Sequence, residues 1–245
     1  AGGILSGASD WYLAGLGPDQ VTWGPFTDSD YLVSAAGTAN GPTMANPYTM
    51  VLGIHVISTP GTSGKLFMGY SETNGSFGTG FFFGGHNSTS NALRFGMVGV
   101  NSGAGNLINI TLTTGAHSIA IKYNGSNIGY SYDGGTVVNI AASGTYTAPG
   151  TVPFTLGRWS GTTLPCDWAA FAYLRGYASY VSDADLQTLS GSPSTYIPTP
   201  ISASPHYDWQ ARWYREIDSR HITSGTGKSS TTPLTVTGYI VKTAR

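Results

Sequence analysis

The sequence is poor in cysteine and in charge. Cys166 is the single cysteine among 245 residues, which excludes an intrachain disulfide framework and a multi-cysteine metal site. We expect Cys166 to be a small buried residue, because no basic neighbour in the sequence would activate its thiol. Charged residues make up 9% of the chain, against roughly 25% in an ordinary soluble domain. Ser, Thr, Asn and Gly must therefore supply most of the polar surface.

The charge that is present is nearly balanced. A formal net charge of −1 gives the chain no electrostatic footprint for nucleic acid or for an anionic membrane. Residues 1–199 hold five Lys or Arg and nine Asp or Glu, whereas residues 200–245 hold six and three. No apolar run approaches the roughly 20 residues of a transmembrane helix, and the first residues lack the basic start of a secretory signal.

Long helical patterns are nearly absent, and turns are abundant, with 35 Gly and 13 Pro. Across residues 116–140, AHSIAIKYNGSNIGYSYDGGTVVNI, side chains alternate with the period of two that is typical of strands. Asn124-Gly125 and Asp133-Gly134 interrupt this alternation with residues that tolerate the positive φ angles of tight turns. The segment therefore predicts a β-meander of three antiparallel strands, around which the remaining chain is organised.

Further strands are indicated by alternation or by continuous apolar runs. The run at 48–59 predicts a strand buried on both faces, and His55 within it is expected to be a core histidine rather than a metal ligand. Ser182 and Gly191 predict the two caps of one short helix. The predicted strands outside the meander are Val21–Phe26, Tyr31–Val33, Tyr48–Thr59, Lys65–Tyr70, Phe81–Gly85, Ala92–Val100, Leu107–Leu112, Phe154–Trp159 and Asp167–Tyr180.

The segment FTLGRWSGTTLPCDWAAFAYLRGYASYVSDADLQTLSG, residues 154–191, resembles the closing part of laminin-G-like, concanavalin A-like jelly rolls. In that family a strand with a Leu-Gly pair, here Leu156-Gly157, precedes an aromatic strand and a short S-D-A-D-L-Q-x-L helix. The meander is similar to the family's paired strands, so the resemblance covers residues 21–191. It implies an all-β fold: a two-sheet antiparallel jelly-roll sandwich, concanavalin A-like, with one short helix.

Members of this fold include lectins, glycan-binding modules, glycoside hydrolases, polysaccharide lyases and modules of bacteriophage fibres and capsids, so the fold alone does not fix a function. The related retaining glucanases carry paired carboxylates on a Glu-x-Asp-x-x-Glu strand. This chain has only Glu72 and Glu216, far apart, and its two Asp-x-Asp pairs fall in a predicted turn and a helix cap. The lyase, serine-hydrolase, zinc-protease and P-loop motifs are also missing. We therefore expect no enzyme.

A calcium ion is a further implication of the resemblance, because laminin-G-like modules often hold one with an Asp and loop carbonyls. Asp133 and Asp167 are the candidate ligands, but a turn explains the first and a strand start the second. No metal site and no cofactor are predicted.

Glycan binding needs an aromatic ring for stacking together with amide or hydroxyl partners on loops. Three segments at predicted strand ends offer these residue types, although each is equally explained by core packing or by ordinary polar loops. The candidate glycan-binding residues are Tyr70, Asn74, His86, Asn87, Arg158 and Trp159.

The C-terminal segment interleaves aromatic residues with arginine in HYDWQARWYREIDSR, residues 206–220, a composition enriched at protein interfaces. The alternative is a strand or helix docked on its own domain. Residues 224–233 have the composition of a linker, and LTVTGYIV, residues 234–241, predicts a strand without a local partner, suited to joining a neighbour's sheet. The candidate interface residues are Tyr207, Trp209, Arg212, Trp213, Tyr214, Arg215 and Tyr239.

These observations predict an N-terminal arm at 1–20, a laminin-G-like sandwich at 21–199 and a C-terminal assembly arm at 200–245. The predicted function is a non-enzymatic virion surface protein of a bacteriophage, either a capsid decoration or a tail-fibre adhesin, with a glycan-binding sandwich. Its predicted partners are other virion subunits or further copies of itself, and a cell-surface glycan. The alternative is a free carbohydrate-binding module, glycoside hydrolase or polysaccharide lyase of the same fold.

Overall fold

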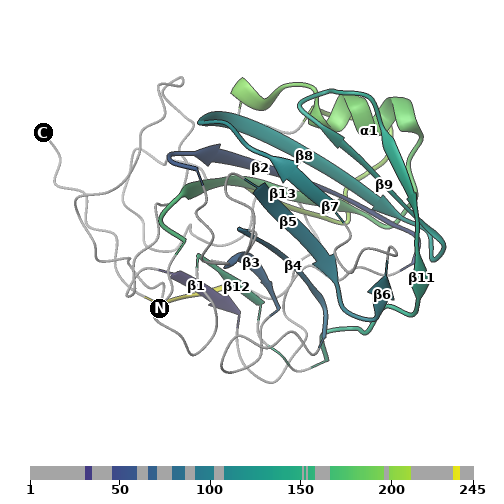
Figure 1. The fold of residues 1–245 in the computed structure, drawn as a ribbon, viewed down its shortest axis with the longest axis horizontal. Coiled ribbons are helices and arrows are strands. Elements are labelled where there is room, and N and C mark those ends of the chain that lie inside the picture. The colour runs from purple at the N-terminus through teal and green to yellow at the C-terminus, as the bar shows by residue number, and fades with distance from the viewer. Residues whose placement is uncertain are drawn as a thin grey trace, which may run out of the picture.

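The fold is an antiparallel two-sheet sandwich with one short helix, as predicted (Figure 1). The computed structural model describes residues 31–34, 46–59, 66–70, 79–85, 92–101, 108–150, 152, 154–157, 166–195, 199–210 and 234–237. Within these ranges no helix is both long enough and apolar enough to cross a membrane.

One layer is a seven-stranded sheet with the order β15-β1-β12-β3-β4-β5-β7. Neighbouring strands in this sheet run antiparallel throughout. Its strands are β1 (Tyr31–Ser34), β3 (Leu66–Tyr70), β4 (Phe81–Gly85), β5 (Ala92–Met97), β7 (Ile108–Thr111), β12 (Phe154–Leu156) and β15 (Leu234–Thr237).

The second layer is a six-stranded antiparallel sheet with the order β10-β9-β8-β2-β13-β14. Its strands are β2 (Tyr48–Val56), β8 (Gly115–Tyr123), β9 (Asn127–Tyr132), β10 (Val138–Ala141), β13 (Ala169–Tyr177) and β14 (Tyr207–Gln210). A two-stranded ladder of β6 (Val100–Asn101) and β11 (Ser143–Gly144) lies at one side, and the helices are α1 (Asp183–Ser190) and the 3-10 turn η2 (Pro193–Thr195).

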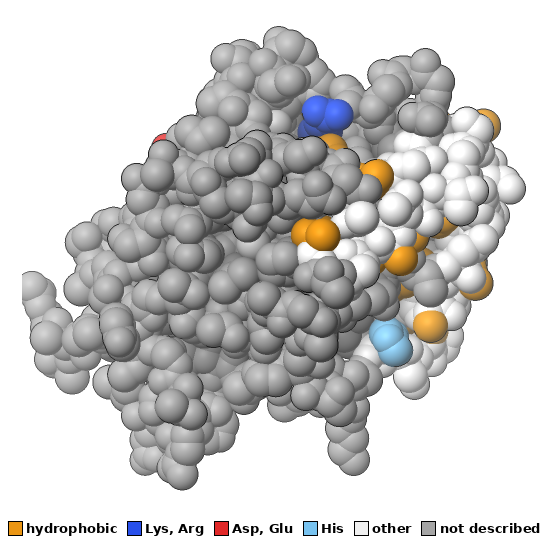
Figure 2. Space-filling view, turned by 90° about the horizontal axis from the view of Figure 1, so that it is seen from below, with side chains coloured by type: hydrophobic (Ala, Val, Ile, Leu, Met, Phe, Trp, Pro, Cys, Tyr) orange, Lys and Arg blue, Asp and Glu red, His pale blue; other side chains and the backbone are white. Residues whose placement is uncertain are grey.

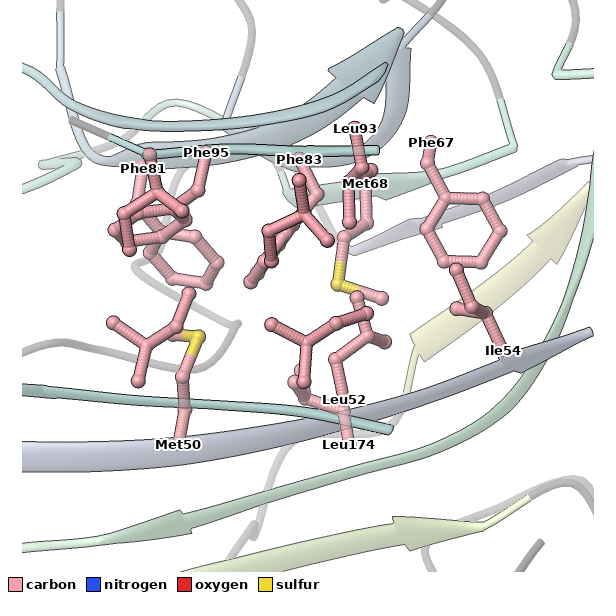
Figure 3. Packing of buried hydrophobic residues seen from close by; sticks show 14 of the residues in the cluster. Met50, Leu52, Ile54, Phe67, Met68, Phe81, Phe83, Leu93, Phe95 and Leu174 are labelled. Carbon is pink, nitrogen blue, oxygen red and sulfur yellow. The ribbon is translucent and has the colours of Figure 1, made fainter. Parts of the chain in front are cut away.

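The core fills the space between the two sheets. From the six-stranded sheet, Met50, Leu52 and Ile54 alternate along β2 and point at the other layer, joined by Leu174 of β13 (Figure 3). The seven-stranded sheet contributes mainly aromatic rings to this core, among which the ring centroids of Phe83 and Phe95 lie 4.8 Å apart. Each such side chain contributes roughly 1.5–3 kcal/mol by leaving water, so this layer of contacts dominates the stability of the fold.

The outer face of the six-stranded sheet is buried as well, because α1 packs against it (Figure 1). Leu186 and Leu189 of the helix meet Val51 and Ala120 of the sheet. The prediction that β2 is buried on both faces is therefore confirmed, since eight of its nine residues are buried. The predicted caps are confirmed too: the Asp185 amide donates to Ser182 Oγ at 3.1 Å, and Gly191 is the C-cap.

A buried lysine fastens the start of this helix to the sheet. Lys122 lies on the outer face of β8 with 2% of its side chain exposed. Its ammonium group donates to the Val181 carbonyl at 3.0 Å and to the Asp183 carboxylate, and it lies 4.3 Å from the centroid of the Tyr180 ring. The hydrogen bond to Lys122 is the main cause that lowers the pKa of Asp183. This contact compensates a charge that would otherwise be too costly to bury.

The central meander is confirmed as β8, β9 and β10 in sequence. Asn124 makes the first turn by accepting hydrogen bonds at its side-chain oxygen from the amides of Ser126 and Asn127. The second turn places Asp133 at φ 49° and Gly134 at φ 73°, the left-handed region that Asp and Gly tolerate. The turn chemistry read from the sequence therefore sets the register of this half of the sheet.

Two predictions about strands need correction. The predicted strand at 92–100 is broken between β5 and β6 because Gly99 has φ 81° and its backbone closely approaches Thr145. The strand predicted at 234–241 has no partner nearby in the sequence, as expected, but β15 pairs with β1 of the same chain, so it does not serve only a neighbour's sheet. The strand predicted at Val21–Phe26 and the N-terminal arm at 1–20 lie outside the described residues.

Candidate functional site

One end of the sandwich gathers the polar groups that the core excludes. We call it the His117 end: here β2, β4, β7, β9 and β12 finish, and β3, β5, β8, β10 and β13 begin. The two layers are joined at this end, because the Cys166 amide donates to the Gly157 carbonyl at 2.6 Å. The rings of Phe67 and Trp168 also pack across it, 5.7 Å apart. Cys166 itself is buried, as predicted.

His117 is a nearly enclosed polar residue at this end, with 6% of its side chain exposed. Its Nδ1 lies 2.8 Å from Asp133 Oδ2, and its Nε2 lies 2.8 Å from the Thr113 carbonyl oxygen. A carbonyl oxygen and an ionised carboxylate can only accept, so both ring nitrogens must carry a proton to satisfy this arrangement. The geometry therefore fits an imidazolium ion paired with a carboxylate.

The electrostatics agree with this protonation. Burial lowers the pKa of His117, but the hydrogen bonds to Asp133 and to the Thr113 carbonyl, with the negative charge of Asp133, outweigh it and raise the pKa. His55 lies on the neighbouring strand, and its pKa is lowered by burial and then by the charge on His117. The pKa values of the two histidines are thus shifted in opposite directions. His55 is only part-buried and alternates with the core-facing Leu52 and Ile54, so it does not have the core position that was predicted.

Asp133 is held on both carboxylate oxygens. Oδ2 accepts from His117, and Oδ1 accepts from the Ser118 amide at 2.8 Å. Tyr132 closes the cluster, since its ring stacks on the His117 ring at 5.1 Å and its hydroxyl lies 2.5 Å from His117 Nδ1. Burial, followed by the charge of Asp133, raises the pKa of the Tyr132 hydroxyl. Chemically this is an ion-pair network in which His117 and Asp133 join the start of β8 to the turn after β9 and to the Thr113 carbonyl before β8.

Five of the six predicted glycan-binding residues lie outside the described residues. For four of these five, the strand from which they continue ends at the His117 end and is described. His86 and Asn87 follow Gly85, the last residue of β4, and Arg158 and Trp159 follow Gly157 directly after β12. Both strands finish at the His117 end, on either side of β3. The topology thus attaches these two predicted segments to the same end of the sandwich.

Tyr70 lies at the opposite end of the sandwich. Tyr70 is the last residue of β3 and pairs with Phe154, the first residue of β12. The Tyr70 side chain is fully buried, and its ring meets the Phe81 and Phe154 rings edge-on at 5.7 and 5.3 Å. The prediction of Tyr70 as a stacking surface for glycan is therefore wrong, because the alternation of β3 turns this ring into the core. Asn74 lies outside the described residues.

The candidate calcium ligands do not form a cluster among the described residues, where no group of three or more His, Cys, Asp or Glu side chains comes together. Asp133 uses its oxygens on His117 and Ser118. Asp167 is exposed just before β13, as a strand start predicts.

The predicted interface residues fall mostly outside the described residues, which include only Tyr207 and Trp209 of that set. Both belong to β14, which pairs antiparallel with β13 at the edge of the six-stranded sheet. The two strands of the predicted arm, β14 and β15, are therefore edge strands of this chain's own sandwich. Arg212, Trp213, Tyr214, Arg215 and Tyr239 lie outside the described residues.

Sequence reasoning did not identify the pair of His117 and Asp133. The two residues are 16 positions apart, and the strand alternation across residues 116–140 records no contact between the first strand and the second turn. The available signal was the meander itself. Strand β9 runs back along β8, so the turn that follows β9 places Asp133 beside the start of β8.

Comparison with known proteins places the fold among remote neighbours. No protein-family model matches the chain, and no curated protein does so either. The carbohydrate-binding module CBM40 of the Ruminococcus gnavus IT-sialidase, bound to α2,3-sialyllactose, is similar over 60% of this chain and 83% of its own, with 15% identity and a TM-score of 0.41.

Two further solved structures are similar at the same level. Domains LG4-5 of the mouse laminin α1 chain match over 65% of this chain and 42% of theirs, with 14% identity and a TM-score of 0.39. A SAP-like pentraxin from Limulus polyphemus matches over 76% of this chain and 94% of its own, with 10% identity and a TM-score of 0.39. At such identities the likeness concerns the fold alone, and the jelly-roll assignment rests on the strand order described above.

Proposed function

We propose that this chain is a non-enzymatic, glycan-binding sandwich that works as a subunit of a larger assembly, on the surface of a bacteriophage virion as a capsid decoration or tail-fibre adhesin. The glycan would bind at the His117 end. The observation that carries this proposal is the attachment of two predicted binding segments, at Gly85 and Gly157, to that one end.

The physical basis is the separation of scaffold and binding residues. Strands β4 and β12 are fixed by the core and are separated in the sheet only by β3, so segments continuing from them start about 10 Å apart. An indole at Trp159 supplies the flat face on which a sugar ring stacks, and the amide and imidazole of Asn87 and His86 supply hydrogen bonds. Uncharged polar recognition also suits a chain with 9% charged residues.

The non-enzymatic part of the proposal is supported by the use of the described acid and base at this end. His117 spends both ring nitrogens and Asp133 both carboxylate oxygens on contacts within the fold. A general base needs a free lone pair directed at its substrate, and His117 has none in this arrangement, because both of its ring nitrogens donate. Asp133 is paired with His117, so its negative charge already has a partner within the fold. The pair therefore acts as a structural fastener.

The assembly part is supported by the sheet edges. Among the described strands, β14 and β15 each pair on one side only, so the other side of each backbone is available to a neighbouring strand. Strand β14 lies in residues 206–220, whose composition of aromatics and arginine is typical of interfaces, and β15 lies in residues 234–241, the strand predicted to suit a neighbour's sheet. A second copy of the chain, or another virion subunit, could join there by strand addition.

The binding proposal is tested with a glycan array followed by titration calorimetry on the sugars that it selects. Trp159→Ala should weaken binding about tenfold, because it removes the stacking face. Asn74→Ala is the matched control, since its segment continues from the opposite end of the sheet and should leave affinity unchanged. Equal loss in both variants, or none in Trp159→Ala, would overturn the placement of the site.

The assembly proposal is tested by light scattering on the full chain. We expect a defined oligomer, and we expect the double variant Trp213→Ala/Tyr214→Ala to shift it toward the monomer. A full chain that stays monomeric at high concentration would favour the alternative, a free carbohydrate-binding module.

A further inference from the structure

The outer face of the seven-stranded sheet carries one arginine in a row of small residues. Along β5, Leu93 and Phe95 point into the core, so Arg94 and Gly96 between and beyond them point outward. Arg94 pairs with Gly84 on one side, which has no side chain, and with Asn109 of β7 on the other. The Arg94 side chain therefore has a neighbour without a side chain on β4 and an amide side chain on β7.

An aromatic ring supports this guanidinium group from below. A Cβ added to Gly96 would lie 2.4 Å from the ring of Phe82, so this ring occupies the space that a side chain at Gly96 would take. The Arg94 guanidinium carbon lies 5.1 Å from the centroid of the same ring. A guanidinium group stacked on an aromatic face is pre-oriented, with its edge left for hydrogen bonds in the plane.

Arg94 carries its charge without an anion. Burial lowers the pKa of its side chain, which shows that surrounding protein has removed part of its hydration. Its Nε atom is buried without a hydrogen-bond partner, and within the described residues no carboxylate forms an ion pair with it. A partly desolvated, unpaired guanidinium group is unfavourable in the free protein, and an incoming anion would relieve it.

The site is open along the edge strand. Phe82 is buried, Arg94 is half-buried, and Asn109 and Thr111 of β7 are exposed, so exposure increases toward that edge. Figure 2 shows one face of the molecule, on which a small group of Lys or Arg atoms lies beside an apolar side chain and is otherwise bordered by residues outside the described ranges. Arg94 is also one residue pair from Gly85, where the predicted segment with His86 and Asn87 begins.

We propose that Arg94 binds the carboxylate of an acidic sugar, with Asn109 donating a further hydrogen bond from its side chain. This inference rests on the proposed function in taking the ligand to be a glycan. The planar fork of a guanidinium group matches the two oxygens of a carboxylate. A single arginine flanked by Gly84 and an amide suits one carboxylate on a neutral sugar chain. A polyanion such as nucleic acid would need several basic groups in a row.

The test is NMR titration of the full chain with glucuronate and with glucose, followed at the amides of Asn109 and Thr111. Sodium acetate provides a carboxylate without a sugar, and sodium chloride at equal ionic strength controls for screening. We expect saturable shifts with glucuronate and weaker ones with acetate at the same amides, and none with glucose there.

Arg94→Gln should reduce the glucuronate affinity roughly ten- to a hundredfold, and Arg94→Lys should restore part of it, because lysine keeps the charge but loses the fork. Lys228→Gln removes one positive charge elsewhere and should have no effect. A thermal melt of each variant shows whether it has folded. If Arg94→Gln is not folded, the comparison of Arg94→Lys with the wild type still decides the test.

The outcomes separate the two proposals. One outcome is that acetate and glucuronate bind in an Arg94-dependent way, while no oligosaccharide on the glycan array binds. This outcome supports the carboxylate site and overturns the proposed function. Binding of neutral glycans that is sensitive to Trp159→Ala, with no response of the Asn109 amide to either acid, overturns the carboxylate site and leaves the proposed function intact.

Discussion

His117 Nδ1 lies 2.8 Å from Asp133 Oδ2, and this contact joins the first strand of the meander to its second turn. Since Asp133 has 26% of its side chain exposed and His117 only 6%, the pair lies at the boundary between core and solvent. Breaking a buried pair by removing one charge is costly because the other charge stays behind. The contact therefore anchors the end of the sandwich to which the proposed binding segments are attached.

Stability should depend on pH through this pair. The pKa of His117 is raised in the folded state. Its contribution to the free energy of unfolding is therefore complete below about pH 6.5, the unfolded pKa, and is lost as the pH rises through the folded pKa. The lowered pKa of His55 acts with the opposite sign, contributing stability above about 6.5 that is lost as the pH falls. Urea unfolding of the wild type and of Asp133→Asn from pH 5 to 9 measures the difference.

In Asp133→Asn we expect a loss of about 2–3 kcal/mol near pH 6, with a smaller gap from the wild type near pH 9, where His117 is neutral in both. A gap that does not change with pH would contradict the ion pair and indicate a purely steric role for Asp133.

The lysine under the helix should be far more important than its partner. Lys122→Ala removes a buried side chain and leaves the Val181 carbonyl without its donor, so we expect a loss of about 3 kcal/mol or more. Asp183→Asn should cost much less, because that side chain is 57% exposed and water can replace it. Chemical denaturation of both variants provides the comparison, and equal losses would contradict the proposed anchoring of α1.

Gly53 should not tolerate a side chain. A Cβ at this position would lie 2.2 Å from the Tyr173 ring, whose hydroxyl lies 2.7 Å from Ser118 Oγ. We expect Gly53→Ala to cost roughly 1–3 kcal/mol by displacing the ring. The double variant Gly53→Ala/Tyr173→Ala should be more stable than the sum of the single losses predicts, because the ring is no longer there to be displaced. Strict additivity would show that the two residues do not interact.

Removing residues 207–245 should destabilise the sandwich rather than release an independent arm. The deletion strips β14 from β13 and β15 from β1, which exposes ladder hydrogen bonds along both sheets. We expect a lower denaturation midpoint and a tendency to aggregate, measured by urea unfolding and light scattering. A truncated chain with unchanged stability would restore the interpretation of this segment as a separate arm.

The sequence predicted the strands well where local chemistry decides them. Alternation and the turns at Asn124-Gly125 and Asp133-Gly134 set the meander, and Ser182 and Gly191 set the helix, because caps and tight turns depend on residues within four positions. The pairing of β15 with β1 was mispredicted because it joins residues about 200 positions apart, which no local pattern records.

The candidate site was harder to predict for the same reason. That His86 and Trp159 continue from the same end of a sheet follows from the antiparallel order of β12, β3 and β4, and neither segment contains a signal for it. Tyr70 was misassigned because an aromatic residue at the end of a strand faces either the core or solvent, and the parity of β3 decides which. Arg94 was passed over because a single arginine in a strand gives no motif.

The strand order also dictates when the chain can close during synthesis. The meander of β8, β9 and β10 contains its own partners and can form as soon as it leaves the ribosome. By contrast, β2 cannot pair with β13 until β13 has been synthesised, and β1 acquires its second neighbouring strand only when residues 234–237 emerge. A nascent chain therefore exposes the apolar face of β2 until most of it has been made.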